Sequence, residues 1–161
     1  MAMNWHSGGL ENFRVKTALF KEDASSTIHT ATFHIPAGWT VYDIIVVPQV
    51  LWTATTSATL KVGDTGATDG FFSSVDLKAT DLVLGERLHA IGGENWGATN
   101  DAYLTTAGRF GQQSADNIGG YMPNAYNIVG TVTVVDPVST AGRTRMTVIY
   151  YRGATVTPVL T

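Results

Sequence analysis

The amino-acid sequence predicts an all-β domain, and three observations support this class. Several segments alternate between apolar and polar side chains, which is the pattern of a half-buried strand. Turn signals rich in Gly and Pro separate these segments. No stretch has the spacing of a long amphipathic helix. Short strands joined by such turns are typical of an antiparallel β-sandwich or barrel.

Composition places the chain among folded domains. Its 161 residues suit one domain, and 44% hydrophobic against 14% charged residues is too apolar for intrinsic disorder. The net charge of −3 argues against a general nucleic-acid-binding surface. Without cysteine the chain has no disulfide, thiolate nucleophile or thiolate metal site. We also expect no signal peptide and no membrane span, since the longest apolar run covers only residues 44–47.

The first region, residues 1–26, is expected to be an N-terminal arm or a first strand that packs on another surface. A single sandwich domain is expected over residues 27–161. The arm's candidate contact residues are Trp5, His6, Leu10 and Phe13.

The domain is expected to begin with two strands. Residues 28–35 alternate, which places His29, Ala31, Phe33 and Ile35 on one face. Residues 39–47 follow a Pro-Ala-Gly turn, and we expect Tyr42, Ile44 and Val46 to share a face. Because both faces of this second segment are apolar, it should be a central strand. Pro48 cannot donate a ladder hydrogen bond and should end or bulge the strand.

Further strands are expected later in the chain. Residues 58–63 form a short third strand in this prediction, and Asp-Gly turn signals follow. Residues 81–85 fit either a strand or a single helical turn. Residues 127–135 and 144–151 alternate strongly, and we expect them to pair as a hairpin. Residues 156–160 fit a tail or a last edge strand.

A long region rich in Gly, Asp, Asn and Ala, residues 64–125, lies between these strands. Loops of this length are commonly functional or ordered by a partner. Segment 64–136 has a net charge of −6 and the rest of the chain +3. Such complementary charge can steer a subunit onto a neighbour or a partner. The alternative, which we favour, is that loops collect Asp for turn chemistry.

No motif for catalysis stands out. His29 and His34 are five residues apart, so a regular strand places them on opposite faces, away from a common ion. Neither a Gly-x-Ser-x-Gly nor a phosphate-loop motif is present, and we expect no enzyme and no cofactor. Asp64 and Asp69 offer hard oxygen ligands for calcium in a Gly-rich loop. Asp-Gly turns need no ion, and we favour the turn interpretation.

Aromatic side chains in the long loop region are further candidates for binding. Trp96, Tyr103 and Phe110 lie in or near Gly-rich segments. The rings either pin their own loops to the domain, anchor a protein interface or stack on sugar rings, and these three interpretations stay open.

A series of strand and turn motifs extends over residues 28–151. It contains Phe-x-Ile-Pro-Ala-Gly at 33–38, Leu-x-Val-Gly-Asp at 60–64 with Asp-Gly-Phe-Phe at 69–72, and the strand pair that contains Gly-Thr-Val at 130–132. This pattern resembles small structural proteins of tailed bacteriophages, in particular head decoration, or cement, proteins. The resemblance implies a jelly-roll-like antiparallel β-sandwich. Because the shared motifs are architectural, it transfers no functional residues.

The resemblance also implies a structural virion protein that binds the outside of a phage capsid and stabilises it by bridging capsomers. The expected partners are the major capsid protein and further copies of this chain, as a homotrimer. We expect no nucleic-acid, membrane or small-molecule partner. The expected location is the outer capsid surface, after synthesis in the host cytoplasm. The alternative is a carbohydrate- or receptor-binding module on a tail or fibre.

Overall fold

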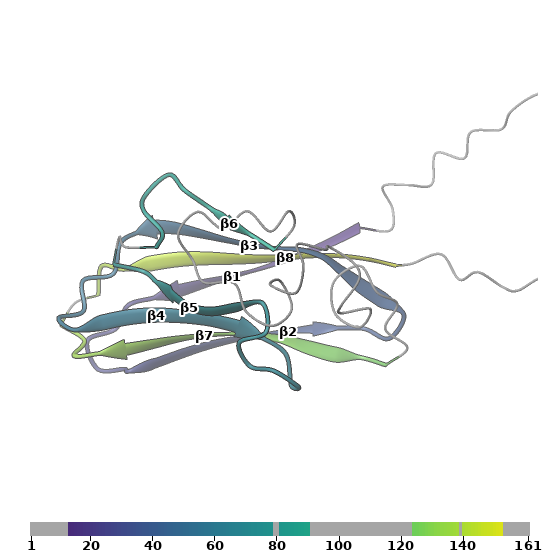
Figure 1. Cartoon of the computed structure of the whole chain (residues 1–161), viewed down its shortest axis with the longest axis horizontal. Helices are drawn as coiled ribbons and strands as arrows, with labels where there is room; N and C mark the ends of the chain where they lie inside the picture. Colours follow the sequence, from purple (N-terminus) through teal and green to yellow (C-terminus); the bar gives the residue numbers. More distant parts are fainter. Residues whose placement is uncertain (1–12, 79–80, 91–123, 139, 153–161) are drawn as a thin grey trace, which may run out of the picture.

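Strands form wherever the apolar and polar residues alternate. The computed structural model describes residues 13–78, 81–90, 124–138 and 140–152, and these contain eight strands and no helix (Figure 1). Accordingly, no helix in the described part is long and apolar enough to cross a membrane. The strands are β1 (Phe13–Lys21), β2 (Ile28–Ile35), β3 (Trp39–Val50), β4 (Ser57–Gly63), β5 (Phe72–Asp76), β6 (Leu88–His89), β7 (Tyr126–Val135) and β8 (Arg143–Arg152).

The strands form two four-stranded sheets, and every strand pairing in them is antiparallel. The first sheet has the order β1-β8-β3-β6 and the second the order β2-β7-β4-β5. Successive strands therefore alternate between the two sheets, except that β4 and β5 are neighbours in the same sheet. Figure 1 shows the two sheets as two layers. The predicted all-β, antiparallel class is confirmed.

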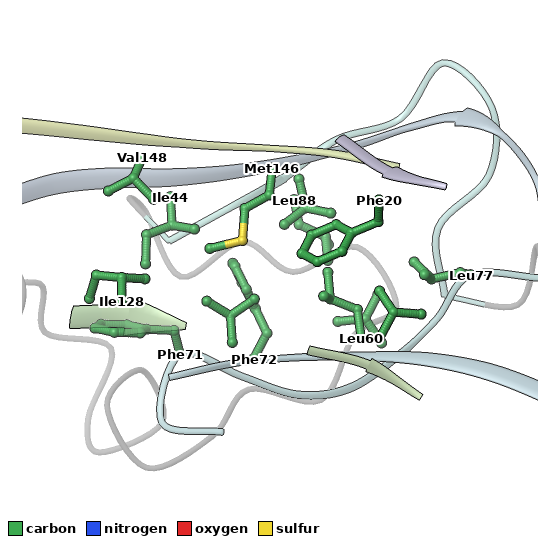
Figure 2. Close-up of a cluster of buried hydrophobic side chains, with 14 of the residues drawn as sticks. Phe20, Ile44, Leu60, Phe71, Phe72, Leu77, Leu88, Ile128, Met146 and Val148 are labelled. Carbon is green, nitrogen blue, oxygen red and sulfur yellow. The ribbon is translucent and has the colours of Figure 1, made fainter. Parts of the chain in front are cut away.

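The hydrophobic core lies between the two layers, as Figure 2 shows. Phe20, Ile44 and Met146 enter it from the first sheet, and Leu60 and Ile128 enter it from the second. Alternation predicted these faces correctly, since the buried positions of β7 and β8 fall on every second residue. In β2 the predicted face is also the inward one, with Phe33 and Ile35 buried.

The predicted hairpin between residues 127–135 and 144–151 is wrong. β7 pairs with β2 and β4, whereas β8 pairs with β1 and β3 in the other sheet. β7 and β8 each have one apolar face, and their alternation predicts only that this face is buried. Alternation does not determine which other strand pairs with each of them.

The predicted faces of β3 need one correction. A register shift between Val41 and Asp43 places Tyr42 at the surface, while Val41 joins Ile44 on the buried side. A bulge adds one residue to the strand and so reverses the alternation beyond it. A second shift occurs at Pro48, as the sequence indicated, and the strand continues to Val50. The central position is confirmed, because β3 lies between β8 and β6.

Residues 81–85 form neither of the predicted structures. They belong to a loop with a turn at its end, where the backbone N–H of Glu86 donates to the carbonyl of Val83 (3.1 Å). The side chain of Glu86 in turn accepts from the N–H of Val83 (3.0 Å). These two hydrogen bonds pair backbone groups within the turn itself, so this short apolar segment does not need to pair with a strand.

A buried carboxylate connects the ends of three strands of the first sheet. Glu22, which follows β1, is only 3% exposed. Its carboxylate accepts from the N–H of Thr53 (3.1 Å), from the Thr53 hydroxyl (3.1 Å) and from the N–H of Gly142 (2.9 Å). Thr53 follows β3 and Gly142 precedes β8. Hydrogen bonds to a charged acceptor are stronger than neutral ones, so this group holds the three segments together.

A different polar contact connects one sheet to the other. The hydroxyl of Tyr126, on β7, accepts from the N–H of Val41 on β3 (3.2 Å). This N–H lies beside the bulge of β3. Burial raises the pKa of the Tyr126 phenol from its ordinary value of 10.0 to about 12.

We predict that Glu22→Gln lowers the free energy of unfolding by about 1–3 kcal/mol. The amide keeps the shape of the side chain but removes the charge and turns a donor toward the N–H groups of Thr53 and Gly142. Urea denaturation measures the change. The matched control is Glu86→Gln at an exposed turn, which should change stability by less than about 0.5 kcal/mol. Equal effects of the two variants would contradict the assigned role of Glu22.

The raised pKa of Tyr126 predicts a loss of stability at alkaline pH. The unfolded chain loses the phenol proton near pH 10.0, whereas the folded chain keeps it to about pH 12. The contribution is therefore complete below pH 10 and is lost as the pH rises toward about 12. Urea denaturation between these values should show a steeper loss for the wild type than for Tyr126→Phe. Parallel pH profiles would contradict the prediction.

Candidate interaction surface

The outer side of the first sheet exposes several large apolar side chains. Phe20 of β1 points into the core, so the odd-numbered residues of β1, from Phe13 to Lys21, point outward. Three of these, Phe13, Val15 and Leu19, are 39%, 61% and 43% exposed. Scattered exposed apolar residues are common on proteins, but contiguous ones mark interaction sites.

Strand register shows that these residues are contiguous with others. Val15 lies opposite Ile149 of β8, and Leu19 lies opposite Arg145. Between these rows the hydroxyls of Thr17 and Thr147 are 3.3 Å apart. The outward residues of β1 and β8 thus form one continuous surface along the two strands.

Three aromatic rings form one end of this surface. The ring of Phe13 lies 5.5 Å from that of Tyr42 and 5.6 Å from that of Tyr151, and the two tyrosine rings are 6.3 Å apart. Centroid separations of this size are those of favourable aromatic pairs. The bulge in β3 matters here, because it turns Tyr42 outward to complete the cluster.

Basic side chains form the other end. Lys21 lies directly opposite Arg143, and Arg145 lies two residues further along β8. All three are exposed. In the part of the chain that the structure describes, none of them makes an ion pair or a side-chain hydrogen bond. We call this surface the β1–β8 face; its residues are Phe13, Val15, Thr17, Leu19, Lys21, Tyr42, Arg143, Arg145, Thr147, Ile149 and Tyr151.

The outer side of the second sheet differs in chemistry. Five threonines lie there beside the exposed Ile28 and Val135, and Lys61 of β4 pairs with Asp69 at 3.6 Å. The outward threonines are Thr30, Thr32, Thr59, Thr131 and Thr133.

The structure describes one residue of the predicted contact set. Phe13 is described, and it begins β1 within the aromatic cluster. The remaining residues of that set lie outside the described part of the chain: Trp5, His6, Leu10, Trp96, Tyr103 and Phe110.

The contacts of Asp64 and Asp69 support the turn interpretation. One carboxylate oxygen of Asp64 accepts from the N–H groups of Gly66 (2.7 Å) and Ala67 (2.9 Å). Asp69 faces Lys61 instead. Side-chain bonds to the backbone two and three residues ahead are the ordinary chemistry of an Asx turn. Among the described residues, no group of three or more His, Cys, Asp or Glu side chains could hold a metal ion.

The histidines are accounted for separately. His29 is half-buried and its ring lies 5.4 Å from that of Trp52, whereas His34 is exposed and its Nδ1 lies 3.1 Å from Asn127 Oδ1. They lie on opposite faces of β2, as predicted. His89 Nδ1 lies 2.9 Å from a carboxylate oxygen of buried Asp43.

Most of the β1–β8 face was not predicted from the sequence. A local signal for it exists, because Phe13, Val15 and Leu19 lie on the face of β1 opposite to the buried Phe20, in the same alternation as in the predicted strands. Arg143 and Arg145 likewise alternate with buried Thr144 and Met146. The pairing of β1 with β8 joins residues more than 120 positions apart, and periodicity contains no information about that pairing.

Comparison with known proteins gives a likeness of fold. No protein-family model matches the chain, and no curated protein matches its sequence significantly. Among solved structures, it is similar to a chain of the acidic stable capsid structure of Helicobacter pylori bacteriophage KHP30. That match has a TM-score of 0.51 and 14% identity, over 87% of each chain.

Two further matches have the same TM-score. A chain of the cyanophage Pam1 capsid asymmetric unit is 19% identical, with 95% of this chain and 93% of that chain covered. A chain of the capsid of Ralstonia phage GP4 is 13% identical, with 94% and 92% covered. At these identities the likeness shows the fold alone, and this protein therefore shares its fold with chains found in three bacteriophage capsids.

Proposed function

We propose that this chain is a structural virion protein that binds the outside of a phage capsid and stabilises it by bridging capsomers. The observation that carries the proposal is the likeness, over most of the chain, to chains of three phage capsids. The motif pattern of residues 28–151, found independently of the structure, supports the same role. On this proposal the protein is not an enzyme.

The strand order supports a jelly-roll form of the sandwich. A jelly roll has eight strands in two sheets built from two Greek keys. Here two four-stranded sheets have the orders β1-β8-β3-β6 and β2-β7-β4-β5, so the last strands insert between earlier ones. Jelly rolls occur widely in viral capsids, which agrees with the proposed role.

The proposed mechanism is mechanical. Each subunit binds the major capsid protein, and three copies form a homotrimer whose contacts with the shell reinforce one another. Once one subunit is engaged, the contacts of the other two are intramolecular and form at high effective concentration. Internal pressure must then break these additional contacts to open the shell. The proposed location is the outer capsid surface.

The N-terminal residues are the proposed capsid or neighbour contacts. Phe13 supports this assignment, because it lies in the aromatic cluster and is covalently continuous with the segment that contains Trp5, His6 and Leu10. The carbohydrate-binding alternative depends on Trp96 and the other loop aromatics. No observation favours it, and we do not propose it.

We predict that virions contain this chain in an amount comparable with the major shell protein. Particles purified from the source are analysed by quantitative mass spectrometry of both chains. A small fraction of the shell protein's abundance would place the chain at a vertex, collar or tail and contradict shell decoration. Absence of the chain from particles would contradict a virion role altogether.

We predict that deletion of residues 1–12 abolishes binding to shells and preserves the fold. The first described strand begins at Phe13, so the deletion removes none of the strand residues that the structure describes. Co-sedimentation with shells that lack this protein measures binding, and thermal denaturation of full-length and shortened chains is the control for folding. Saturation of the shells by the shortened chain would contradict the assignment.

A further inference from the structure

The β1–β8 face combines an apolar surface with cations that have no partner in the described structure. Lys21 and Arg143 are directly opposite on adjacent strands, and Arg145 follows on the same face. Like charges in directly opposite positions destabilise a sheet. The chain thus maintains an unfavourable arrangement that an anionic partner would turn into an attractive one.

The acidic residues that the structure describes are poor candidates for that partner. Every described carboxylate is already engaged within its own subunit by a hydrogen bond or an ion pair. These residues are Glu22, Asp23, Asp43, Asp64, Asp69, Asp76, Asp81, Glu86 and Asp136. A second copy that offered one of these nine acids to the face would have to share a carboxylate that is already engaged, which favours a different molecule.

The apolar part of the face determines the class of that molecule. Val15 and Ile149 lie in the same row, between the basic end and the aromatic end. A nucleic-acid backbone would pair with the cations but would leave these apolar side chains against phosphate. A protein surface with carboxylates beside apolar residues satisfies both ends. The net charge of −3 also disfavours nucleic acid.

We propose that the β1–β8 face docks onto a different protein, through a surface that carries carboxylates next to apolar side chains. The carboxylates face Lys21, Arg143 and Arg145, and the apolar residues cover Val15, Leu19 and the aromatic end. This proposal deepens the proposed function and rests on it for the location of the partner, which is the shell protein. The chemistry of the face is testable on the isolated chain.

The first experiment measures binding of the full chain to three probes at rising salt concentration. The probes are a random copolymer of glutamate and tyrosine, polyglutamate and a DNA duplex. We expect the copolymer to bind more tightly than polyglutamate, because it offers apolar surface as well as charge, and to weaken as salt screens the charges. Duplex DNA that binds as tightly as the copolymer would overturn the proposal.

Variants test whether the face itself is responsible. The double variant Arg143→Glu with Arg145→Glu should bind the copolymer about tenfold more weakly, since repulsion replaces attraction. Lys61→Glu, with the same type of charge change on the outer side of the second sheet, should bind as the wild type does. If the double variant fails to fold in thermal denaturation, Val15→Ser, at a 61% exposed position, provides the test with a weaker expected loss. Unchanged copolymer binding by a folded face variant would overturn the proposal.

The same variants separate this proposal from the proposed function. In co-sedimentation with shells, we expect the double variant to bind more weakly than both the wild type and Lys61→Glu. If the double variant binds shells as well as the wild type does, the docking face is overturned and the virion role stays intact. No shell binding by the wild type would overturn the virion role, while the probe results would still decide the chemistry of the face. Analytical sedimentation compares self-association of the wild type and of Val15→Ser. If the wild type self-associates and Val15→Ser does not, the face binds a second copy, and the proposal is overturned.

Discussion

Each sheet of this protein buries one of its sides against the other sheet. Phe20, Ile44 and Met146 on one layer and Leu60 and Ile128 on the other have no alternative place to be buried. This mutual burial dictates the alternation of side chains in every long strand and makes the outward residues available for other purposes. The polar groups at the margins follow from it, since Glu22 and Tyr126 satisfy backbone N–H groups where the ladders end or bulge.

The local alternation of side chains predicted most of the strands. The errors concern strand pairing, which depends on residues far apart in the sequence. The alternation of β2, β7 and β8 was predicted correctly, because alternation depends only on neighbours in the sequence. The partner of each strand depends on residues far away, which is why β7 and β8 were paired with each other although they lie in different sheets. At Tyr42 a single extra residue reversed the faces, and no local signal marked it.

The candidate surface shows the same division. Phe13 was predicted to be a contact residue from its type and place, and the structure puts its side chain at the surface. Its proximity to Tyr42 and Tyr151, and the row formed by Lys21 and Arg143, appear only once β1 is aligned with β8. A binding surface on a sheet is assembled from several strands, so its chemistry is distributed along the sequence and is visible only after pairing is known. The turn at Asp64, by contrast, is local, and its chemistry was predicted from the sequence.

The insertion of the last two strands between earlier ones has a consequence for biosynthesis. β8 lies between β1 and β3, and β7 lies between β2 and β4, so neither sheet has its central ladder until the end of the chain is available. During translation, the apolar sides of the first strands leave the ribosome without their neighbours. Folding dominated by such distant pairings is slow, and unpaired strand edges are prone to associate with other chains in the meantime. Until β7 and β8 emerge, a nascent chain of this protein therefore exposes unpaired strand edges and apolar sides that the finished fold covers.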